Sequence, residues 1–214
     1  MPSSAQSLLI LLAAYLIGSV SGSLLIGRLH GVDIRTQGSG NAGGSNAFRT
    51  QGFAFGAGAA LFDIAKGALV AWVALRCAPT ESRFDATVHA YAAAFAAMIG
   101  HVWPLWHGFR GGKGAATLAG SVLVLWPWVT PALVVVWIAT MVSSGYVGLA
   151  TVAAGIALAV IAWFTGAEPA RLVFANAAAM LLLFTHRGNL ARLQTGGESR
   201  FERARLLHRL WRRP

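Results

Sequence analysis

Long runs of apolar residues alternate along this chain with short segments rich in glycine and polar side chains. The first run, Ser7 to Gly27, contains no charged residue and would extend over about 30 Å as a helix, enough to cross a lipid bilayer. Further apolar blocks follow at 52–75, 87–107, 114–143, 147–165 and 170–185. Because a helix satisfies its own backbone hydrogen bonds in lipid, the pattern predicts an all-α protein of membrane-spanning helices.

The block at 114–143 is too long for one ordinary membrane helix, and it contains Pro127 and Pro131. Proline lacks the backbone N–H and clashes with the preceding helical turn, so the sequence predicts a break there. The block then crosses the membrane either once or twice. This choice determines on which side of the membrane the chain ends.

The distribution of positive charge decides between the two topologies. With seven spans, the segments 28–50, 108–113 and 186–214 share one side and hold thirteen basic residues, against three on the other side. With six spans, the arginine-rich tail would lie on the opposite side of the membrane from the two basic loops. Basic residues concentrate on the cytoplasmic side of membrane proteins. We therefore expect about seven transmembrane helices, with the N-terminus outside and the C-terminus and polar loops on the cytoplasmic face.

The composition agrees with a protein embedded in lipid. Hydrophobic residues make up 56% of the 214 residues and charged residues only 11%, whereas soluble domains carry about 25% charged residues. The net charge of +10 does not indicate nucleic acid binding, because the basic residues flank apolar blocks or lie in the tail. No long linker divides the sequence. We expect a single transmembrane domain over 1–214, with a basic cytoplasmic tail at 199–214 that contacts anionic headgroups.

Three polar, glycine-rich segments fall on the predicted cytoplasmic side. They read RTQGSGNAGGSNAFRTQG (35–52), GHVWPLWHGFRGGKGAAT (100–117) and THRGNLARLQTGGES (185–199). Each combines glycines, hydrogen-bonding side chains and at least one cation, as anion sites do. The second segment is no nucleotide P-loop, because Gly114 follows Lys113 and His107 occupies the place of the first glycine. Together the segments predict a phosphate-binding face level with the lipid headgroups.

Two charged residues, Asp63 and Lys66 in LFDIAKG, lie inside an apolar block, where isolated charges are costly. We expect a structural ion pair, formed either between them or with a loop. His101, at the head of the second glycine-rich segment, has either a structural hydrogen bond or a role in the site. The histidines are scattered and lack the spacing of a zinc site, so no metal site is predicted.

These motifs together resemble the bacterial acylphosphate:glycerol-3-phosphate acyltransferases. The matching stretches occur in the same order over nearly the whole chain: GSGNAGGSN with Arg49, LFDIAKG, GHVWPLWHGFRGGKGAAT, and HRGNLARL with Glu198. The resemblance implies a seven-span enzyme of the bacterial inner membrane that transfers a fatty acyl group from acyl phosphate to the 1-hydroxyl of glycerol 3-phosphate. The products would be 1-acylglycerol 3-phosphate and phosphate, in the first acylation of phospholipid synthesis, without a cofactor.

The resemblance also implies roles for single residues. Lys113, Arg49 and His186 are the predicted catalytic residues: the two cations neutralise phosphate, and His186 orients the acceptor or takes its proton. The acceptor's own phosphate is the alternative proton acceptor. The predicted substrate-binding residues are Ser39, Asn41, Ser45, Asn46, Gly111, Gly112, Thr151 and Asn189, of which Asn41 and Asn46 are expected to act through loop structure. The family usually has arginine and serine where this chain has Gly145 and Gly148.

The sequence itself is compatible with transfer from an activated donor. It contains neither a G-x-S-x-G nucleophile elbow nor a histidine followed by aspartate at the spacing of the common glycerolipid acyltransferases. Two other classes are open. A carrier for a phosphorylated metabolite would place its cations near the membrane midplane and show internal repeats. A structural subunit would not need three polar, glycine-rich segments, so we favour the enzyme.

Overall fold

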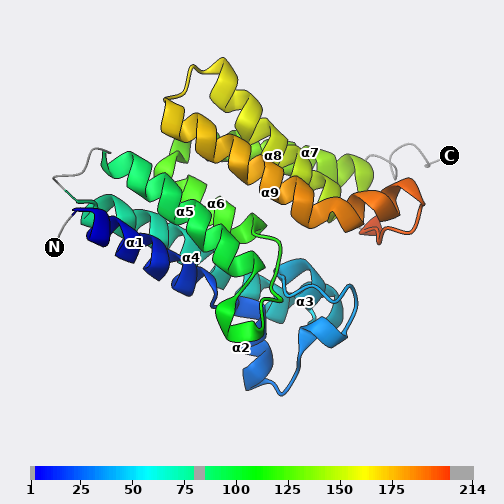
Figure 1. Cartoon of the computed structure of the whole chain (residues 1–214). Coiled ribbons are helices and arrows are strands. Elements are labelled where there is room, and N and C mark those ends of the chain that lie inside the picture. Colours follow the sequence, from blue (N-terminus) through cyan, green and yellow to red (C-terminus); the bar gives the residue numbers. More distant parts are fainter. Residues whose placement is uncertain (1–2, 80–84, 203–214) are drawn as a thin grey trace. The chain divides into compact units, whose positions relative to one another are not determined.

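The computed structural model describes residues 3–79 and 85–202, and this part of the chain consists of helices and loops without a β-strand (Figure 1). The all-α prediction is therefore confirmed for the described residues. The α-helices are α1 (Ser3–Gly18), α2 (Gly22–Leu29), α3 (Gly44–Gln51), α4 (Phe53–Cys77), α5 (Ala86–Val102), α6 (Ala115–Leu125), α7 (Thr130–Ser144), α8 (Val147–Phe164) and α9 (Pro169–Gln194). Short 3₁₀ turns occur at η1 (Ile34–Thr36), η2 (Leu105–His107) and η3 (Pro127–Val129).

Five segments in the described part of the chain are long and apolar enough to cross a membrane, and six if the bent pair α1–α2 counts as one span. The five are Phe53–Cys77, Ala86–His107, Pro127–Ser144, Val147–Phe164 and Pro169–Gln194. Helix α6 is apolar but has only 11 residues. At about 1.5 Å per residue, α6 is too short to cross the hydrocarbon layer by itself.

The first helix differs from the prediction of one continuous span over Ser7–Gly27. The helix ends at Gly18, resumes at Gly22, and bends by 46° between the two pieces. Ser19 and Ser21, within the break, are fully buried. The free backbone groups of the break bond to charged side chains of α4, which the local sequence of α1 and α2 does not reveal.

The predicted break in the block at 114–143 is confirmed. Helix α6 ends at Leu125, η3 begins at Pro127, and α7 follows from Thr130 with Pro131 in its first turn. Proline is tolerated at the first positions of a helix, where its missing N–H would have no partner. The two prolines therefore both interrupt the apolar block and start the helix that follows.

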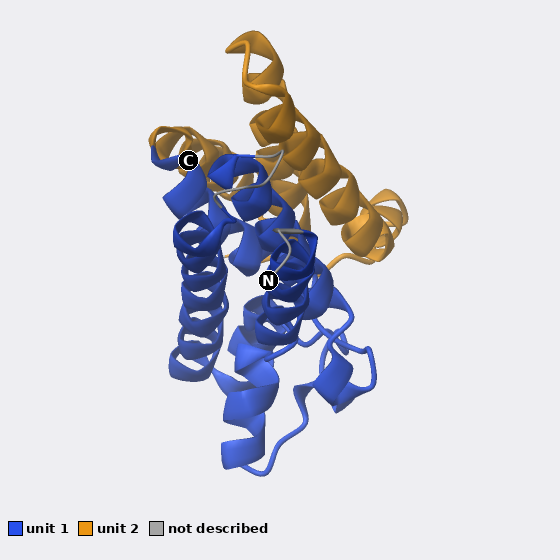
Figure 2. Ribbon diagram, turned by 60° about the vertical axis from the view of Figure 1, so that its left-hand side comes forward, with its two compact units in different colours: residues 1–127 blue, residues 128–214 orange. Residues whose placement is uncertain are grey.

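The chain divides into two compact units, residues 1–127 and residues 128–214 (Figure 2). In the first unit, α4 packs against α1, α5 and α6, and α1 packs against α5. Glycines allow the backbones of α4 and α6 to approach closely: a Cβ on Gly120 would lie 1.8 Å from the Ile64 carbonyl oxygen, and one on Gly67 would lie 2.1 Å from that of Thr117. Small residues at such contacts favour helix association in lipid.

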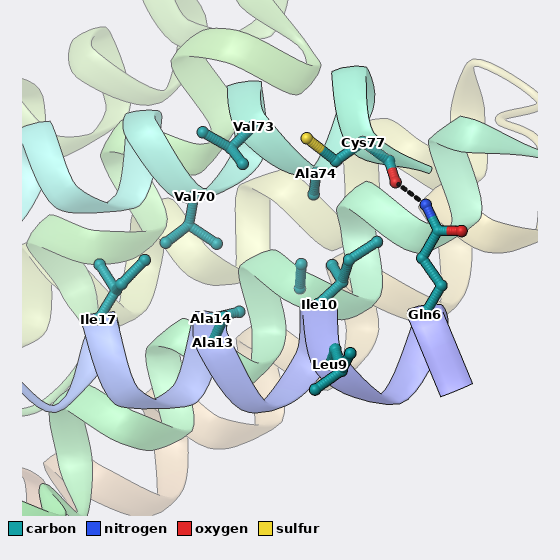
Figure 3. A pocket seen from close by; sticks show the side chains of 11 residues that line it. Gln6, Leu9, Ile10, Ala13, Ala14, Ile17, Val70, Val73, Ala74 and Cys77 are labelled. Atoms are coloured by element: carbon teal, nitrogen blue, oxygen red, sulfur yellow. Dashed lines mark hydrogen bonds between the residues drawn. The ribbon is translucent and has the colours of Figure 1, made fainter. Parts of the chain in front are cut away.

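An apolar groove of about 230 Å³ lies in the first unit along α1 and α4 (Figure 3). Its lining residues include Leu9, Ile10, Ala14, Val70 and Val73. At one end, Gln6 Nε2 donates a hydrogen bond to the Cys77 carbonyl oxygen at 3.0 Å (Figure 3). Because Cys77 ends α4 whereas the first polar loop precedes its start at Phe53, this end of the groove is far along α4 from that loop.

The second unit contains α7, α8 and α9, with α8 packed against both of its neighbours. Helix α9 differs from the prediction, because it continues through HRGNLARL to Gln194 and does not end at 185. His186 and Asn189 therefore lie on a helix. The glycine and polar residues of the third polar segment had suggested a loop instead. Residues 203–214, which form most of the predicted basic tail, lie outside the described residues.

Candidate active site

The first polar loop is anchored to its unit by η1. Ile34 is fully buried and belongs to a small cluster with Leu24, Ala42 and Ala47. Asp33 precedes η1, and its Oδ1 accepts hydrogen bonds from the Arg35 backbone N–H at 2.9 Å and from Arg35 Nε at 3.0 Å. The hydrogen bonds from Arg35 lower the pKa of the Asp33 carboxyl, and the same pairing raises the pKa of Arg35.

Asn46 organises the rest of this loop from inside. Its side chain is 1% exposed, and its Nδ2 donates to the carbonyl oxygens of Ile34 and Gln37, each at 3.0 Å. Its Oδ1 accepts from the Ser39 backbone N–H at 2.9 Å. The amide thus bonds three backbone groups of a turn that no regular secondary structure would satisfy. This arrangement agrees with the expectation that Asn46 acts through loop structure.

The loop and α3 present the polar residues predicted to bind phosphate. Ser39 is exposed in the loop, and Ser45 and Arg49 are exposed on α3. A spacing of four residues places Ser45 and Arg49 on the same face of this helix. Asn41 is partly buried, and a Cβ on Gly43 would lie 2.6 Å from its Nδ2.

The second polar loop turns back on the end of α5. Gly108 and Phe109 both have left-handed backbone conformations, with φ of 64° and 59°, and Phe109 is the one non-glycine residue of the described chain with a positive φ. The Gly111 N–H donates to the Val102 carbonyl oxygen at 3.2 Å, and the Gly112 N–H donates to that of His101 at 3.1 Å. These two backbone N–H groups therefore hold the loop against the end of α5, and the substrate-binding role of Gly111 and Gly112 stays a prediction.

Arg35 joins the two loops. Its Nη1 donates to the carbonyl oxygen of His107 at 2.9 Å and lies 3.5 Å from that of Arg110. The backbones of the two loops also approach each other at Gly112 and Ala42, since a Cβ on Gly112 would lie 2.8 Å from the Ala42 carbonyl oxygen. Ser39 and Lys113 are thus carried by loops that contact each other within the first unit, and Arg49 lies on α3, which follows the first of these loops. Lys113 lies immediately before Gly114, the N-cap residue of α6.

The predicted ion pair of Asp63 and Lys66 is confirmed. Lys66 Nζ lies 2.9 Å from Asp63 Oδ1, and both side chains are almost completely buried in the first unit. His101 contributes to the same cluster, with its Nδ1 at 2.9 Å from Lys66 Nζ. Of the two roles expected for His101, a structural hydrogen bond is therefore present.

Thr151, His186 and Asn189 lie in the second unit, where the contact between α8 and α9 brings them together. A Cβ on Gly148 would lie 3.0 Å from Asn189 Cβ, and one on Gly155 would lie 2.7 Å from Leu182 Cδ1. In this antiparallel register, Thr151 is level with His186. All three polar side chains are buried, at 8% or less exposure.

Hydrogen bonds fix the orientation of these three side chains. His186 Nδ1 lies 2.9 Å from the Leu182 carbonyl oxygen, so Nδ1 is the donor and Nε2 is the basic nitrogen of the neutral ring. Thr151 Oγ1 donates to the Val147 carbonyl oxygen at 2.9 Å and accepts from Trp137 Nε1 at 3.3 Å. Asn189 Nδ2 donates to Glu198 Oε1 at 2.6 Å.

The segment after α9 folds back over this part of the second unit. Glu198 Oε2 accepts from Arg192 Nε at 2.8 Å, and the Phe201 N–H donates to the Gly145 carbonyl oxygen at 2.9 Å. Arg200 donates to the Tyr146 hydroxyl and stacks over its ring at 4.7 Å. The segment therefore supports Asn189 through Glu198. The absence of a side chain at Gly148 leaves room for Asn189, because a Cβ there would lie 3.1 Å from Asn189 Nδ2.

Sequence reasoning missed the roles of Arg35 and Arg200. Both were counted only as positive charges of the cytoplasmic side. A usable signal existed for Arg35, because aspartate two residues earlier is well placed to bond its side chain at a turn. No local signal pointed from Arg200 to Tyr146, which lies 54 residues away in sequence.

Comparison with known proteins identifies the family. A model of the glycerol-3-phosphate acyltransferase family matches residues 8–196. A glycerol-3-phosphate acyltransferase of Myxococcus xanthus (strain DK1622) is 43% identical over 197 residues, covering 90% of this chain and 98% of that protein. One from Roseiflexus sp. (strain RS-1) is 41% identical over 209 residues, covering 95% and 98%.

A solved structure agrees with these relatives. The glycerol 3-phosphate form of PlsY, an integral membrane glycerol 3-phosphate acyltransferase, matches with a TM-score of 0.85 and 33% identity, over 94% of this chain and 98% of PlsY. The lysophosphatidic acid form of PlsY matches with a TM-score of 0.83. Together with the apolar helices, this match defines an integral, multi-pass membrane protein. The chain belongs to the glycerol-3-phosphate acyltransferase family.

Proposed function

We propose that this protein transfers a fatty acyl group from acyl phosphate to the 1-hydroxyl of glycerol 3-phosphate, giving 1-acylglycerol 3-phosphate and inorganic phosphate. The observation that supports this most is the contact between two polar loops next to apolar helices. The first loop leads into α3, which carries Arg49, and the second loop carries Lys113. An acyl phosphate has an apolar tail and an anionic head. Such a molecule fits a site where cationic loops adjoin helices that contact lipid.

The chemistry proposed for the first unit is charge neutralisation. The acceptor hydroxyl oxygen attacks the acyl carbonyl carbon, a new C–O bond forms, and the bond between that carbon and the phosphate oxygen breaks. Negative charge gathers on the carbonyl oxygen and on the leaving phosphate. Lys113 and Arg49 stabilise this charge, with Ser39 and Ser45 donating hydrogen bonds to phosphate oxygens. A mixed anhydride has a good leaving group, so no covalent acyl-enzyme is required.

In the second unit, His186, Asn189 and Thr151 are proposed to bind and orient glycerol 3-phosphate. The hydroxyl proton must leave as the new bond forms. His186 Nε2 is suited to accept it, because Nδ1 already donates to the Leu182 carbonyl oxygen. The phosphate group of the acceptor is the second candidate for this proton. The two routes predict different effects of replacing His186.

The topology proposed for the chain has seven spans. The bent pair α1–α2 counts as one span, and the short helix α6 counts as another, although α6 by itself covers only about half of the hydrocarbon layer. The N-terminus would be outside and the C-terminus cytoplasmic, in the bacterial inner membrane. The charge distribution supports this arrangement, since thirteen basic residues then share the cytoplasmic side. Residues 1–214 would act as one functional domain, with the polar loops on the cytoplasmic face.

The test is phosphate release by the purified full chain in lipid vesicles. Palmitoyl phosphate and glycerol 3-phosphate are supplied together, each alone, and with palmitoyl-CoA in place of the acyl phosphate. Release that requires both substrates, with 1-acylglycerol 3-phosphate formed in equal amount and no reaction of the CoA ester, is expected. If the folded protein releases no phosphate, uptake of labelled glycerol 3-phosphate into the same vesicles tests the carrier function instead.

A further inference from the structure

Three buried ionisable side chains meet inside the first unit, next to the loop that carries Lys113. Asp63 and Lys66 come from α4, and His101 comes from α5. Lys66 Nζ lies 2.9 Å from Asp63 Oδ1 and 2.9 Å from His101 Nδ1. The side chain of Asp63 is 1% exposed, that of Lys66 is 4% exposed and that of His101 is 3% exposed. Burying charges in a membrane protein is costly. We call these residues the buried ion cluster.

One side of the buried ion cluster bonds to the break between α1 and α2. Lys66 Nζ donates to the carbonyl oxygens of Gly18 at 2.9 Å and Val20 at 2.7 Å, and the Gly22 N–H donates to Asp63 Oδ1 at 3.1 Å. These are the backbone groups that lose helical partners at the break. The ammonium and the carboxylate therefore replace helical hydrogen bonds that the bend removes.

The other side of the cluster meets the loop that carries Lys113. An ammonium has no acceptor, so His101 Nδ1 accepts from Lys66 and the ring hydrogen lies on Nε2. The ring edge with Nε2 covers Gly112, since a Cβ on that residue would lie 2.2 Å from Nε2. The Gly112 N–H also donates to the His101 carbonyl oxygen at 3.1 Å. Both the ring and the backbone of His101 thus fix the residue before Lys113.

We propose that Asp63 and Lys66 are positioning residues for catalysis: through His101, they fix the loop that presents Lys113 to the substrate phosphate. This inference rests on the proposed role of Lys113. An ion pair that only balanced its own charges could be exchanged for apolar residues without loss, as buried pairs in other proteins often can. A pair that orients a histidine against the loop cannot be exchanged in this way.

The decisive variant is the paired substitution Asp63→Leu/Lys66→Met in the full chain, purified and assayed in lipid. It removes both charges together, so no uncompensated charge remains in the bundle. We expect a cooperative thermal transition, together with kcat/KM lowered about tenfold or more and a raised KM for palmitoyl phosphate. If kcat and KM both stay within about twofold of the parent values, the proposal is wrong.

His89→Leu is the matched control. His89 is also buried on α5, and it bonds Ser7 Oγ at 2.9 Å and the Asp85 carbonyl oxygen at 3.0 Å, at the opposite end of α5 from the glycine loop. Its replacement removes a buried histidine from the same helix and should lower thermal stability. Because His89 does not touch the loop, kcat/KM should stay within about twofold of the parent value.

Asp63→Glu is a second variant, which keeps both charges but moves the carboxylate by one methylene. It is expected to fold and to raise the KM for palmitoyl phosphate, and unchanged kinetics would contradict the proposal. Loss of folding in both variants would also overturn it, because the cluster would then be a requirement of the fold. The parent chain separates the two hypotheses: if it releases no phosphate, the proposed function fails, whereas equal activity of parent and variants overturns only the positioning role.

Discussion

Arg35 Nη1 donates a hydrogen bond to the carbonyl oxygen of His107 at 2.9 Å and so links two loops that are 72 residues apart in sequence. The guanidinium is held from the other side by Asp33, whose Oδ2 lies 2.7 Å from Arg35 Nη2. A planar guanidinium has five donors in a fixed arrangement, which suits it to connect a carboxylate with a backbone carbonyl. The first loop carries Ser39, and the second carries Lys113, so this contact sets their separation.

Replacing Arg35 with alanine should therefore lower activity more than stability. The side chains of Arg35 and Asp33 are 25% and 42% exposed, and such pairs contribute about 1 kcal/mol or less. We expect Arg35→Ala to change thermal stability little but to lower kcat/KM about tenfold, since small displacements of positioned groups are costly. The matched control is Arg171→Ala, which breaks the Arg171–Glu168 pair of almost equal exposure, 25% and 40%, at the start of α9. Equal kinetic effects of the two substitutions would contradict this prediction.

The Asp33–Arg35 pair also predicts a dependence of stability on pH. Hydrogen bonds from Arg35 lower the pKa of Asp33 in the folded protein below its ordinary value of 3.8. A lowered carboxyl pKa contributes stability that is present above the unfolded value and is lost as the pH falls through the folded value. The difference in melting temperature between the parent and Asp33→Asn should thus be constant near neutral pH, begin to shrink below about pH 4, and disappear once the pH is below the lowered pKa of Asp33. A difference that grew on acidification would have the wrong sign.

Substitution of Asn46 should lower the stability of the protein more than the small size of this side chain suggests. Asn46→Ala leaves the Ser39 N–H and the carbonyl oxygens of Ile34 and Gln37 without their partner, which we expect to cost about 2 kcal/mol. Asn46→Asp keeps the acceptor for Ser39 but places carboxylate oxygen against two carbonyl oxygens. Both variants should lower melting temperature and activity together. Asn176→Ala removes one hydrogen bond to the Leu172 carbonyl oxygen within α9 and a long, exposed one from Trp163 Nε1 at 3.4 Å, so it should have a much smaller effect.

The sequence predicted those parts of the fold whose causes are local. Pro127 and Pro131 predicted the interruption between α6 and α7, because the effect of proline depends only on the adjacent turn. Similarly, the cost of charge in an apolar block predicted that Asp63 and Lys66 form a pair. The resemblance to a known family predicted the reaction class, and the roles that it implies for single residues stay predictions.

The parts that could not be predicted depend on partners distant in sequence. The break in the first helix is stabilised by Lys66, 48 residues after Gly18, so the uncharged run from Ser7 to Gly27 shows no sign of it. The extension of α9 beyond 185 is accompanied by contacts of Glu198 with Asn189 and Arg192. The glycine and polar residues in HRGNLARL are compatible with a helix and with a loop. Only the contacts of Glu198 therefore distinguish the continued helix from a loop.

Lys113→Ala should almost abolish turnover and leave the folded protein intact. The side chain is partly buried in a loop, and we expect kcat/KM to fall about a hundredfold or more, the usual effect of removing a group that stabilises developing charge. The melting temperature should change little. Arg28→Ala removes one exposed cation from the end of α2, outside the glycine-rich loops, and should keep most of the activity. Full activity of Lys113→Ala would remove this residue from the mechanism.

The proton acceptor can be identified by replacing His186 with two different amides. In His186→Asn, the side-chain amide can still donate to the Leu182 carbonyl oxygen as Nδ1 does, but it has no basic nitrogen. In His186→Gln, the amide reaches further, toward the position of Nε2. If His186 is the general base, both variants should lower kcat about a hundredfold or more, with smaller changes in the KM for glycerol 3-phosphate.

The pH profile separates this role from an orienting one. A general base gives the parent a kcat that falls as the pH drops through the pKa of the histidine, and the amide variants should lack this step. If His186 only orients the acceptor, His186→Gln or His186→Asn should raise KM, retain most of kcat and keep the acid limb of the profile. That acid limb would then report the phosphate of glycerol 3-phosphate, which would be assigned as the group that takes the proton.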